Sequence, residues 1–255
     1  ALSIGSGLVT AYIPKCGYEI LQTALPEVMV ETDAQNEITK INSKVEASAI
    51  GIGIGLGTST KTLNGFKEFL QHNKTPLIID ADAINLIAKD KALLTLIPEG
   101  SVLTPHPKEF ERLTGESKDD FEKLNTLIKL ATDLKSVVLI KGRYTSIAYE
   151  NTLFFNQTGN PGLATGGTGD VLTGMITGLL AQGYTAFEAT IFGVYLHGLT
   201  ANVAMKDLTY ETFTASDCID YLPEAFKELF RREQPVQAQD QEEEQQNSSK
   251  EQKQS

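Results

Sequence analysis

The sequence contains no tryptophan and only two cysteines, Cys16 and Cys218, in 255 residues. These cysteines lie far apart and form no CxxC pair, which argues against a cysteine-based zinc site and against dithiol redox chemistry. Such low cysteine usage suits a reducing compartment, so we expect a cytoplasmic protein. No basic segment precedes an apolar one near Ala1, so no secretory signal is expected.

Long apolar runs and clusters of positive charge are also missing. The longest apolar stretch, residues 171–181, is interrupted by Thr and Gly and is too short to cross a bilayer. The formal net charge is -11 and the Lys and Arg residues form no run, which argues against nucleic-acid binding. We therefore expect a small-molecule partner, with no nucleic acid and no membrane.

Short apolar runs alternate with amphipathic segments, which is the pattern of parallel strands joined by crossover helices. The pattern predicts strands at residues 7–13, 48–52, 76–80, 101–104 and 137–141, and a hairpin of 145–150 with 152–156. Helices are predicted at residues 60–72, 83–88, 107–113, 118–134, 168–182, 186–205 and 214–230. The sequence thus predicts one α/β domain over residues 1–230.

The last segment, residues 231–255, is rich in Gln, Glu, Lys and Ser and has no aromatic residue. Such a segment buries too little apolar surface to offset its ordering entropy, so a disordered polar tail is predicted. A solvated end and a partner-binding tail are both open interpretations of its role.

The densest glycine motif spans residues 160–174 and ends where a helix begins. Gly166, Gly167 and Gly169 let backbone N–H groups converge, and the helix start adds free donors and a partial positive charge. Such donors can stabilise a transferring phosphoryl group. Asp170, in the first turn, is favoured in its ionised form by the helix dipole and is the predicted catalytic base. The alternative is a tight turn with close helix packing and a helix-stabilising Asp170.

A second glycine cluster, residues 51–57, follows a predicted strand and precedes a helix. Leu56 and Thr58 break the GxGxxG spacing, and Thr60 stands where a P-loop needs glycine before Lys61. Ligands in open α/β sheets usually bind at the carboxyl ends of strands, where this loop lies. A plain strand-to-helix turn is the alternative.

Three further strand ends carry polar side chains. Asp82 follows one strand and is either an N-cap or a site residue. His106 is held between two prolines after the strand predicted at 101–104. Lys141 ends the strand predicted at 137–141, where a lysine suits a nucleotide phosphate. The alternative is an exposed lysine at a strand end without a specific role. His197, inside an apolar helix, is predicted to be a satisfied core histidine.

Together these segments resemble the ADP- or ATP-dependent NAD(P)H-hydrate dehydratases of the ribokinase-like superfamily. The motifs are GIGLG (53–57), DADAIN (80–85), TPHPKE (104–109), KGRYT (141–145) and NPGLATGGTGDVLTG (160–174). They occur in the family's order and cover the chain from Ser6 to about Phe230. The resemblance implies a three-layer α/β/α fold with a central, mostly parallel sheet.

The resemblance also implies a carbon–oxygen lyase that repairs a damaged cofactor, the hydrated form of NADH or NADPH. Asp170 would remove the proton of the ring hydroxyl, which ADP or ATP would phosphorylate. Elimination of phosphate would then restore the reduced ring, with release of AMP from ADP or of ADP from ATP. The sequence does not say which nucleotide is preferred.

Motif position assigns the binding residues that the resemblance implies. The hydrated substrate would contact Gly53, Gly55, Gly57, His106 and Asp170. The nucleotide would contact Lys141, Gly142, Arg143, Tyr144, Thr145, Asn160, Gly166, Gly167 and Gly169. Mg²⁺ is expected as the partner of the phosphates, reached through water from Glu109.

The chain departs from the family pattern in two ways. Lys108 stands where many members have glycine, and the family's opening strand, glycine turn and first helix are expected before Ala1. A homo-oligomer and a preceding epimerase domain are also expected from the resemblance. The alternative functions are a vitamin-precursor kinase of the same superfamily and a nucleotide-binding chain without activity.

Overall fold

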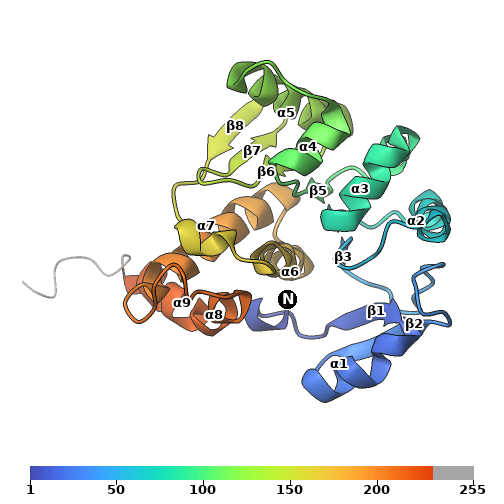
Figure 1. Cartoon of the computed structure of the whole chain (residues 1–255), viewed down its shortest axis with the longest axis horizontal. Helices are drawn as coiled ribbons and strands as arrows, with labels where there is room; N and C mark the ends of the chain where they lie inside the picture. Colours follow the sequence, from blue (N-terminus) through green and yellow to red (C-terminus); the bar gives the residue numbers. More distant parts are fainter. Residues whose placement is uncertain (232–255) are drawn as a thin grey trace, which may run out of the picture.

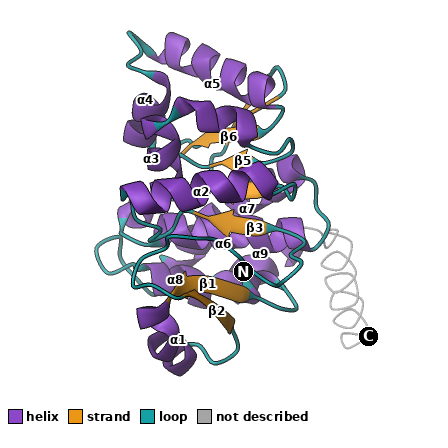
Figure 2. Ribbon diagram, turned by 90° about the vertical axis from the view of Figure 1, so that its right-hand side faces the viewer, coloured by secondary structure: helices purple, strands orange, loops and turns teal. Residues whose placement is uncertain are grey.

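The computed structural model describes residues 1–231, which form two sheets flanked by helices (Figure 1). The described strands are β1 (Thr10–Pro14), β2 (Met29–Asp33), β3 (Ile50–Ile52), β4 (Leu77–Ile79), β5 (Val102–Leu103), β6 (Val137–Ile140), β7 (Ser146–Tyr149) and β8 (Thr152–Phe155). Strands β3 to β8 form one sheet in chain order. Strands β3 to β6 run parallel, while β7 and β8 are antiparallel, so the predicted mostly parallel sheet is confirmed. Strands β1 and β2 pair in parallel as a separate sheet, which lies with α1 (Tyr18–Ala24) at one end of the molecule (Figure 2).

The remaining helices cover both faces of the larger sheet. The described α-helices after α1 are α2 (Thr60–His72), α3 (Ala81–Lys89), α4 (Pro107–Thr114), α5 (Asp120–Leu134), α6 (Thr168–Ala181), α7 (Ala186–Ala204), α8 (Ala215–Asp220) and α9 (Leu222–Arg231). Short 3₁₀ helices are η1 (Leu2–Ile4), η2 (Lys15–Gly17), η3 (Lys91–Leu96) and η4 (Pro161–Ala164). Helices α2 to α5 lie on one face and α6 and α7 on the other (Figure 1).

The core is divided by the sheet into two apolar clusters. In β4, Ile78 packs in the cluster with α6 and α7, whereas its neighbours Leu77 and Ile79 pack in the cluster with α2 to α5. Successive side chains of a strand point to opposite faces, so a sheet covered on both sides needs apolar residues at every position. This explains why the predicted strands are continuous apolar runs.

Most predicted elements are present, with ends shifted by a few residues. Helix α1 and strand β2 were not predicted. Helix α1 buries none of its side chains, and the buried residue of β2 is the polar Asp33, so neither segment has a clear apolar pattern. The helix predicted over 214–230 is two helices, α8 and α9, which separate at Tyr221. Pro223 lies in the first turn of α9, where the missing N–H of proline costs no hydrogen bond. The tail predicted for 231–255 lies, apart from Arg231, outside the described residues.

Helix α6 packs closely because of its small residues. A Cβ at Gly178 would collide with Ile4 of η1, and one at Gly51 of β3 would lie 2.6 Å from Thr177 Oγ1. Helix α6 therefore packs closely against η1 at Gly178 and against β3 at Thr177. Helix α6 is held against β3 and β4, which fixes its N-terminus beside the carboxyl ends of the strands. No helix within residues 1–231 is long and apolar enough to span a bilayer.

Candidate active site at the carboxyl ends of the strands

The candidate site is centred on a buried ion pair that joins two strand ends. Asp80 follows β4 and Lys141 follows β6, and Lys141 Nζ donates to Asp80 Oδ1 at 2.7 Å. Asp80 Oδ2 accepts a hydrogen bond from Thr173 Oγ1 of α6, also at 2.7 Å. Asp80 and Thr173 are each 1% exposed, and the Lys141 side chain is 22% exposed. The pairing compensates the burial of both charges and links the sheet to α6.

The backbone around Asp80 is strained and tightly packed. Ala81, the first residue of α3, has φ 47°, a left-handed conformation that costs a residue with a Cβ about 1–2 kcal/mol. Gly53, in the loop after β3, has φ 122°, and a Cβ there would collide with the carbonyl oxygen of Asp80. Strain of this kind persists only where its surroundings over-determine the conformation, and it clusters at functional sites.

The N-terminus of α6 meets this ion pair from the other side. Gly167 is the N-cap, with φ 91° and no side chain to accept from the first N–H groups of the helix. An ideal Cβ on Gly169 would lie 3.3 Å from Lys141 Nζ, so a side chain there would crowd the ammonium group. Free helix donors, a lysine and an absence of side-chain bulk are what a phosphate group needs at a binding site.

Asp170 lies in the first turn of α6 and titrates under the influence of the same pair. Partial burial of its carboxyl group raises its pKa above the usual value, the charge of Asp80 raises it further, and Lys141 opposes the change. The helix dipole, which favours the ionised form, is therefore opposed by burial and by Asp80. A carboxylate with a raised pKa is a stronger base, which suits Asp170 to accept a proton.

His197 of α7 fixes the start of α6. Its Nε2 lies 2.9 Å from the carbonyl oxygen of Thr168, and because a carbonyl only accepts, Nε2 carries the proton. Burial lowers the pKa of His197 to about 4, while the bond to Thr168 opposes the shift and Lys141 adds to it. His197 is thus a neutral, satisfied core histidine, as predicted.

Side-chain bonds also brace the glycine-rich loop that leads into α6. Asn160 is the N-cap of η4 and accepts from the Gly162 N–H at 3.0 Å. Thr165 Oγ1 donates to the Phe213 carbonyl at 3.1 Å, and Thr168 Oγ1 donates to the Leu163 carbonyl at 2.7 Å. At Gly166 an added Cβ would meet nothing within 4 Å, so this part of the loop is open.

His106 and Glu109 form a capping box at the start of α4. His106 Nδ1 accepts from the N–H groups of Lys108 and Glu109 at 3.1 and 3.3 Å, and Glu109 Oε2 accepts from the His106 N–H at 2.8 Å. Glu109 Oε1 lies 3.4 Å from His106 Nε2. The ring of His106 is thus held rigidly, and its contact with a substrate stays a prediction.

Asp82 has a different role from the N-cap considered for it. Asp80 is the N-cap of α3, and Asp82 lies in the first turn of the helix, so the N-cap interpretation is wrong. Asp82 Oδ2 accepts from the Gly57 N–H at 2.9 Å and so ties the loop after β3 to α3. Gly55 and Gly57 have φ 61° and 83°, which glycine adopts without strain.

The other residues that are predicted to bind the nucleotide, 141–145, form the connection between β6 and β7. Thr145 Oγ1 donates to the Gly142 carbonyl at 3.3 Å, which closes the turn. The guanidinium group of Arg143 lies 5.4 Å from the centre of the Tyr144 ring, and Tyr144 is 56% exposed. Within this segment, Lys141 is the residue that contacts Asp80.

Sequence reasoning assigned no role to Asp80 or Thr173. A signal for Asp80 was present, because an acid that directly follows the apolar run of β4 is buried and needs a partner. No signal identified Thr173, which lies in the middle of the helix predicted over residues 168–182.

Comparisons with known proteins place the chain in a family. A family model described as NAD(P)H-hydrate dehydratase matches residues 1–224. The bifunctional NAD(P)H-hydrate repair enzyme of Moorella thermoacetica is 36% identical over 243 residues, which are 90% of this chain and 46% of that relative. The chain therefore spans about half the length of this curated relative.

Two solved structures share the fold. The ADP/ATP-dependent NAD(P)H-hydrate dehydratase of Bacillus subtilis, co-crystallised with ATP and Mg²⁺, is 30% identical with a TM-score of 0.77, covering 89% of this chain and 81% of that chain. A ribokinase-like superfamily protein of Enterococcus faecalis V583 is 32% identical with a TM-score of 0.71, covering 88% of this chain and 79% of that chain. The predicted ribokinase-like α/β fold is confirmed.

Proposed function

Because the chain belongs to the NAD(P)H-hydrate dehydratase family, we propose that it dehydrates the hydrated nicotinamide ring of NADH or NADPH at the expense of a nucleotide phosphoryl group. One observation carries this proposal. Asp170, with its raised pKa, lies at a helix N-terminus whose free donors adjoin the ammonium group of Lys141. A base and an anion site side by side are what phosphorylation of a hydroxyl requires.

In the proposed reaction, the Asp170 carboxylate accepts the proton of the ring hydroxyl. The hydroxyl oxygen then forms a bond to the terminal phosphorus, and the bond to the leaving nucleotide breaks, which releases AMP from ADP or ADP from ATP. The carbon–oxygen bond of the ring phosphate breaks next, phosphate departs with the electron pair, and loss of a proton from the adjacent carbon restores the double bond. The N–H groups at the start of α6 and Lys141 would hold the negative charge during phosphoryl transfer.

We place the two substrates on opposite sides of the ion pair. The ring would lie against Gly53, Gly55, Gly57 and His106, where glycine allows close approach of the backbone. The nucleotide would lie over Lys141 to Thr145 and against Asn160, Gly166, Gly167 and Gly169. The exposed ring of Tyr144 offers a face on which a purine base can stack.

Mg²⁺ would accompany the phosphates of the nucleotide and neutralise part of their charge. Glu109 suits the predicted contact through water, because its side chain is 7% exposed and its two known contacts, both to His106, leave lone pairs free. Glu109 would supply an oriented hydrogen-bond acceptor for a water bound to the metal.

The activity test is recovery of the near-ultraviolet absorbance of NADPH from hydrated NADPH, with ADP or ATP added. Asp170→Asn is expected to lower kcat about a thousandfold, the scale of general base catalysis. Asp120→Asn is the matched control, since Asp120 lies in the first turn of α5 and is fully on the surface. Unchanged turnover in Asp170→Asn would show that another group is the base.

The two alternatives have distinct outcomes in the same assay. A vitamin-precursor kinase would phosphorylate an added hydroxyethyl or hydroxymethyl compound and leave hydrated NADPH unchanged. A binding protein would retain ADP in a titration and catalyse neither reaction.

Further partners are part of the proposal for the whole protein. The Moorella relative is named as bifunctional and is about twice as long as the matched part, so we propose an additional epimerase domain in the parent protein. An opening strand before Ala1 and assembly into a homo-oligomer stay predictions. The separation of β1 from β3 leaves an edge on each sheet to which such a strand could pair.

A further inference from the structure

A surface hollow of about 580 Å³ lies next to the loop that is proposed to hold the ring. Its walls come from α3, α4 and the segment before α2, and the lining residues are Thr58, Asp82, Asn85, Ala88, Lys89 and Arg112. Of the residues that the sequence analysis considered for the site, Asp82 lines it. Its position next to the glycine loop raises the question of which ligand it would take.

The hollow contains two cations that form no ion pair among the described residues. Lys89 Nζ donates to the Thr58 carbonyl at 2.7 Å, and Arg112 Nη1 donates to Asn85 Oδ1 at 2.9 Å. Lysine has three donors and arginine five, so most of their N–H groups are free for a ligand. The one carboxylate in the lining, that of Asp82, accepts from Gly57. The hollow therefore has an excess of positive charge.

The hollow is linked to the catalytic centre through α3 and the glycine loop. The bonds from Gly57 to Asp82 and from Lys89 to Thr58 tie the glycine loop to α3. Helix α3 begins directly after Asp80 and ends at Lys89. At about 1.5 Å per residue, Lys89 lies about 12 Å along this helix from its start, so the cations are well separated from the reacting atoms.

We propose that this hollow binds phosphate groups of the adenosine half of the dinucleotide substrate while the hydrated ring lies at Asp170. The proposal rests on the proposed function, because only a dinucleotide carries phosphates so far from the reacting ring. A chain of net charge -11 repels an anionic substrate, so local cations are needed to bind it. The guanidinium of Arg112 can hold a phosphate with two parallel hydrogen bonds, and Lys89 adds a point charge.

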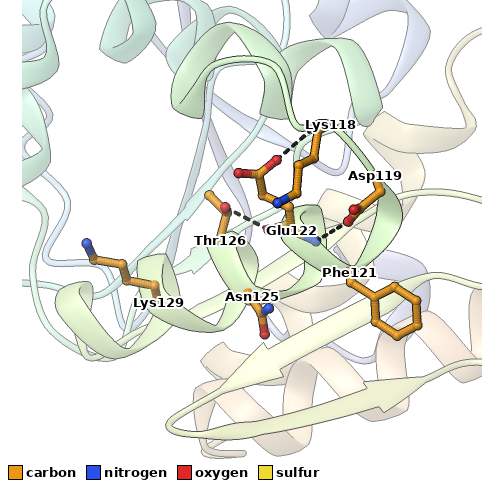
Figure 3. Close-up of a pocket in the computed structure, with 7 residues that line it drawn as sticks. All are labelled: Lys118, Asp119, Phe121, Glu122, Asn125, Thr126 and Lys129. Atoms are coloured by element: carbon orange, nitrogen blue, oxygen red, sulfur yellow. Dashed lines mark hydrogen bonds between the residues drawn. The ribbon is translucent and has the colours of Figure 1, made fainter.

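A second surface hollow also contains lysines but has no excess of positive charge. It has a volume of about 410 Å³ and lies along α5, where Lys118 and Lys129 are accompanied by Asp119 and Glu122 (Figure 3). Asp119 accepts from the Glu122 N–H at 2.8 Å, and Glu122 accepts from the Lys118 N–H at 2.7 Å, so both acids serve the start of the helix. Its charges balance and no hydrogen bond within residues 1–231 ties it to the glycine loop, which makes its lysines suitable controls.

The test uses a double variant, Lys89→Gln with Arg112→Gln, which removes both charges and keeps donors for Thr58 and Asn85. Three substrates are compared, namely hydrated NADPH, hydrated NADH and the hydrated reduced nicotinamide mononucleotide, which lacks the adenosine half. Lys118→Gln with Lys129→Gln is the matched control. A second double variant, Lys89→Arg with Arg112→Lys, keeps both charges and loses only the two parallel bonds of Arg112, so it is expected to raise the dinucleotide KM less than the Gln variant does.

For both dinucleotides, Lys89→Gln with Arg112→Gln is expected to raise KM about tenfold, with kcat and the KM of ADP unchanged. The mononucleotide KM is expected to be equal in the variant and the wild type. A larger rise for NADPH hydrate than for NADH hydrate assigns the cations to the 2′-phosphate, and an equal rise assigns them to the pyrophosphate.

Two results would overturn the proposal while leaving the proposed function intact. One is an unchanged dinucleotide KM in an active enzyme, and the other is an equal rise for the mononucleotide, which would indicate a general disturbance of the loop. A wild type that dehydrates none of the three hydrates would refute the proposed function itself and this proposal with it.

Discussion

Removal of the negative charge of Asp80 is expected to destabilise the protein strongly. Asp80→Asn keeps the shape of the side chain but leaves Lys141, with 22% of its side chain exposed, without its charged partner. Breaking a buried pair by removing one member costs about 3–5 kcal/mol, and the partial exposure of Lys141 places the expected loss near 3 kcal/mol. With a urea slope of about 2 kcal/mol per molar, the midpoint of unfolding would fall by about 1.5 M.

A double-mutant cycle separates the ion pair from other effects of the substitution. Lys141→Met alone leaves Asp80 buried without its cation, so it should also be strongly destabilising. The variant with both substitutions has no unpaired charge and is expected to lose about 2 kcal/mol less than the sum of the two single losses. Additive losses in the urea titrations would show that the two charges do not interact in the folded protein.

The substitution Asp80→Asn is also expected to change the pH dependence of activity. Burial and the charge of Asp80 both raise the pKa of Asp170. Asp80→Asn removes the second cause, so the pKa of Asp170 falls and the acid limb of the kcat/KM profile moves to lower pH. An acid limb that stays in place or moves to higher pH would contradict this coupling.

Three further predictions concern stability. The pKa of His197 is 6.5 in the unfolded chain and about 4 in the folded protein, so the buried neutral ring costs no stability above pH 6.5. As the pH falls from 6.5 to 4, the free energy of unfolding should fall by about 3 kcal/mol, because only the unfolded chain binds the proton. In urea titrations over this pH range, His197→Gln should not show this part of the fall in unfolding free energy. Gly53→Ala should lower the melting temperature far more than Gly55→Ala, because a Cβ at Gly53 meets Asp80 and one at Gly55 meets nothing within 4 Å. Thr173→Val should cost about 1–2 kcal/mol in urea titrations, as Asp80 loses one donor, and an unchanged midpoint would mean that the bond adds no stability.

The sequence by itself determined the local elements and the chemistry at their ends. Continuous apolar runs identified β4 and β6, because a strand covered on both faces needs apolar side chains at every position. Glycine and proline marked the loops, and the residues after Ile79 and Ile140 were recognisable as strand ends. The start of α6 at Thr168 was also predicted, since the glycine run precedes an apolar helical pattern.

Only the tertiary structure decided how those ends combine. Asp80 and Lys141 are 61 residues apart, and Asp80 and Thr173 are 93 apart, so their contacts depend on the order of strands in the sheet and on how α6 crosses it. No local pattern encodes that order, because each contact forms only when several crossovers have been made. For the same reason the pKa of Asp170 could not be read from its place in a helix alone. The sequence identified a carboxylate at a helix start, and the fold brought Asp80 and Lys141 beside it to set its basicity.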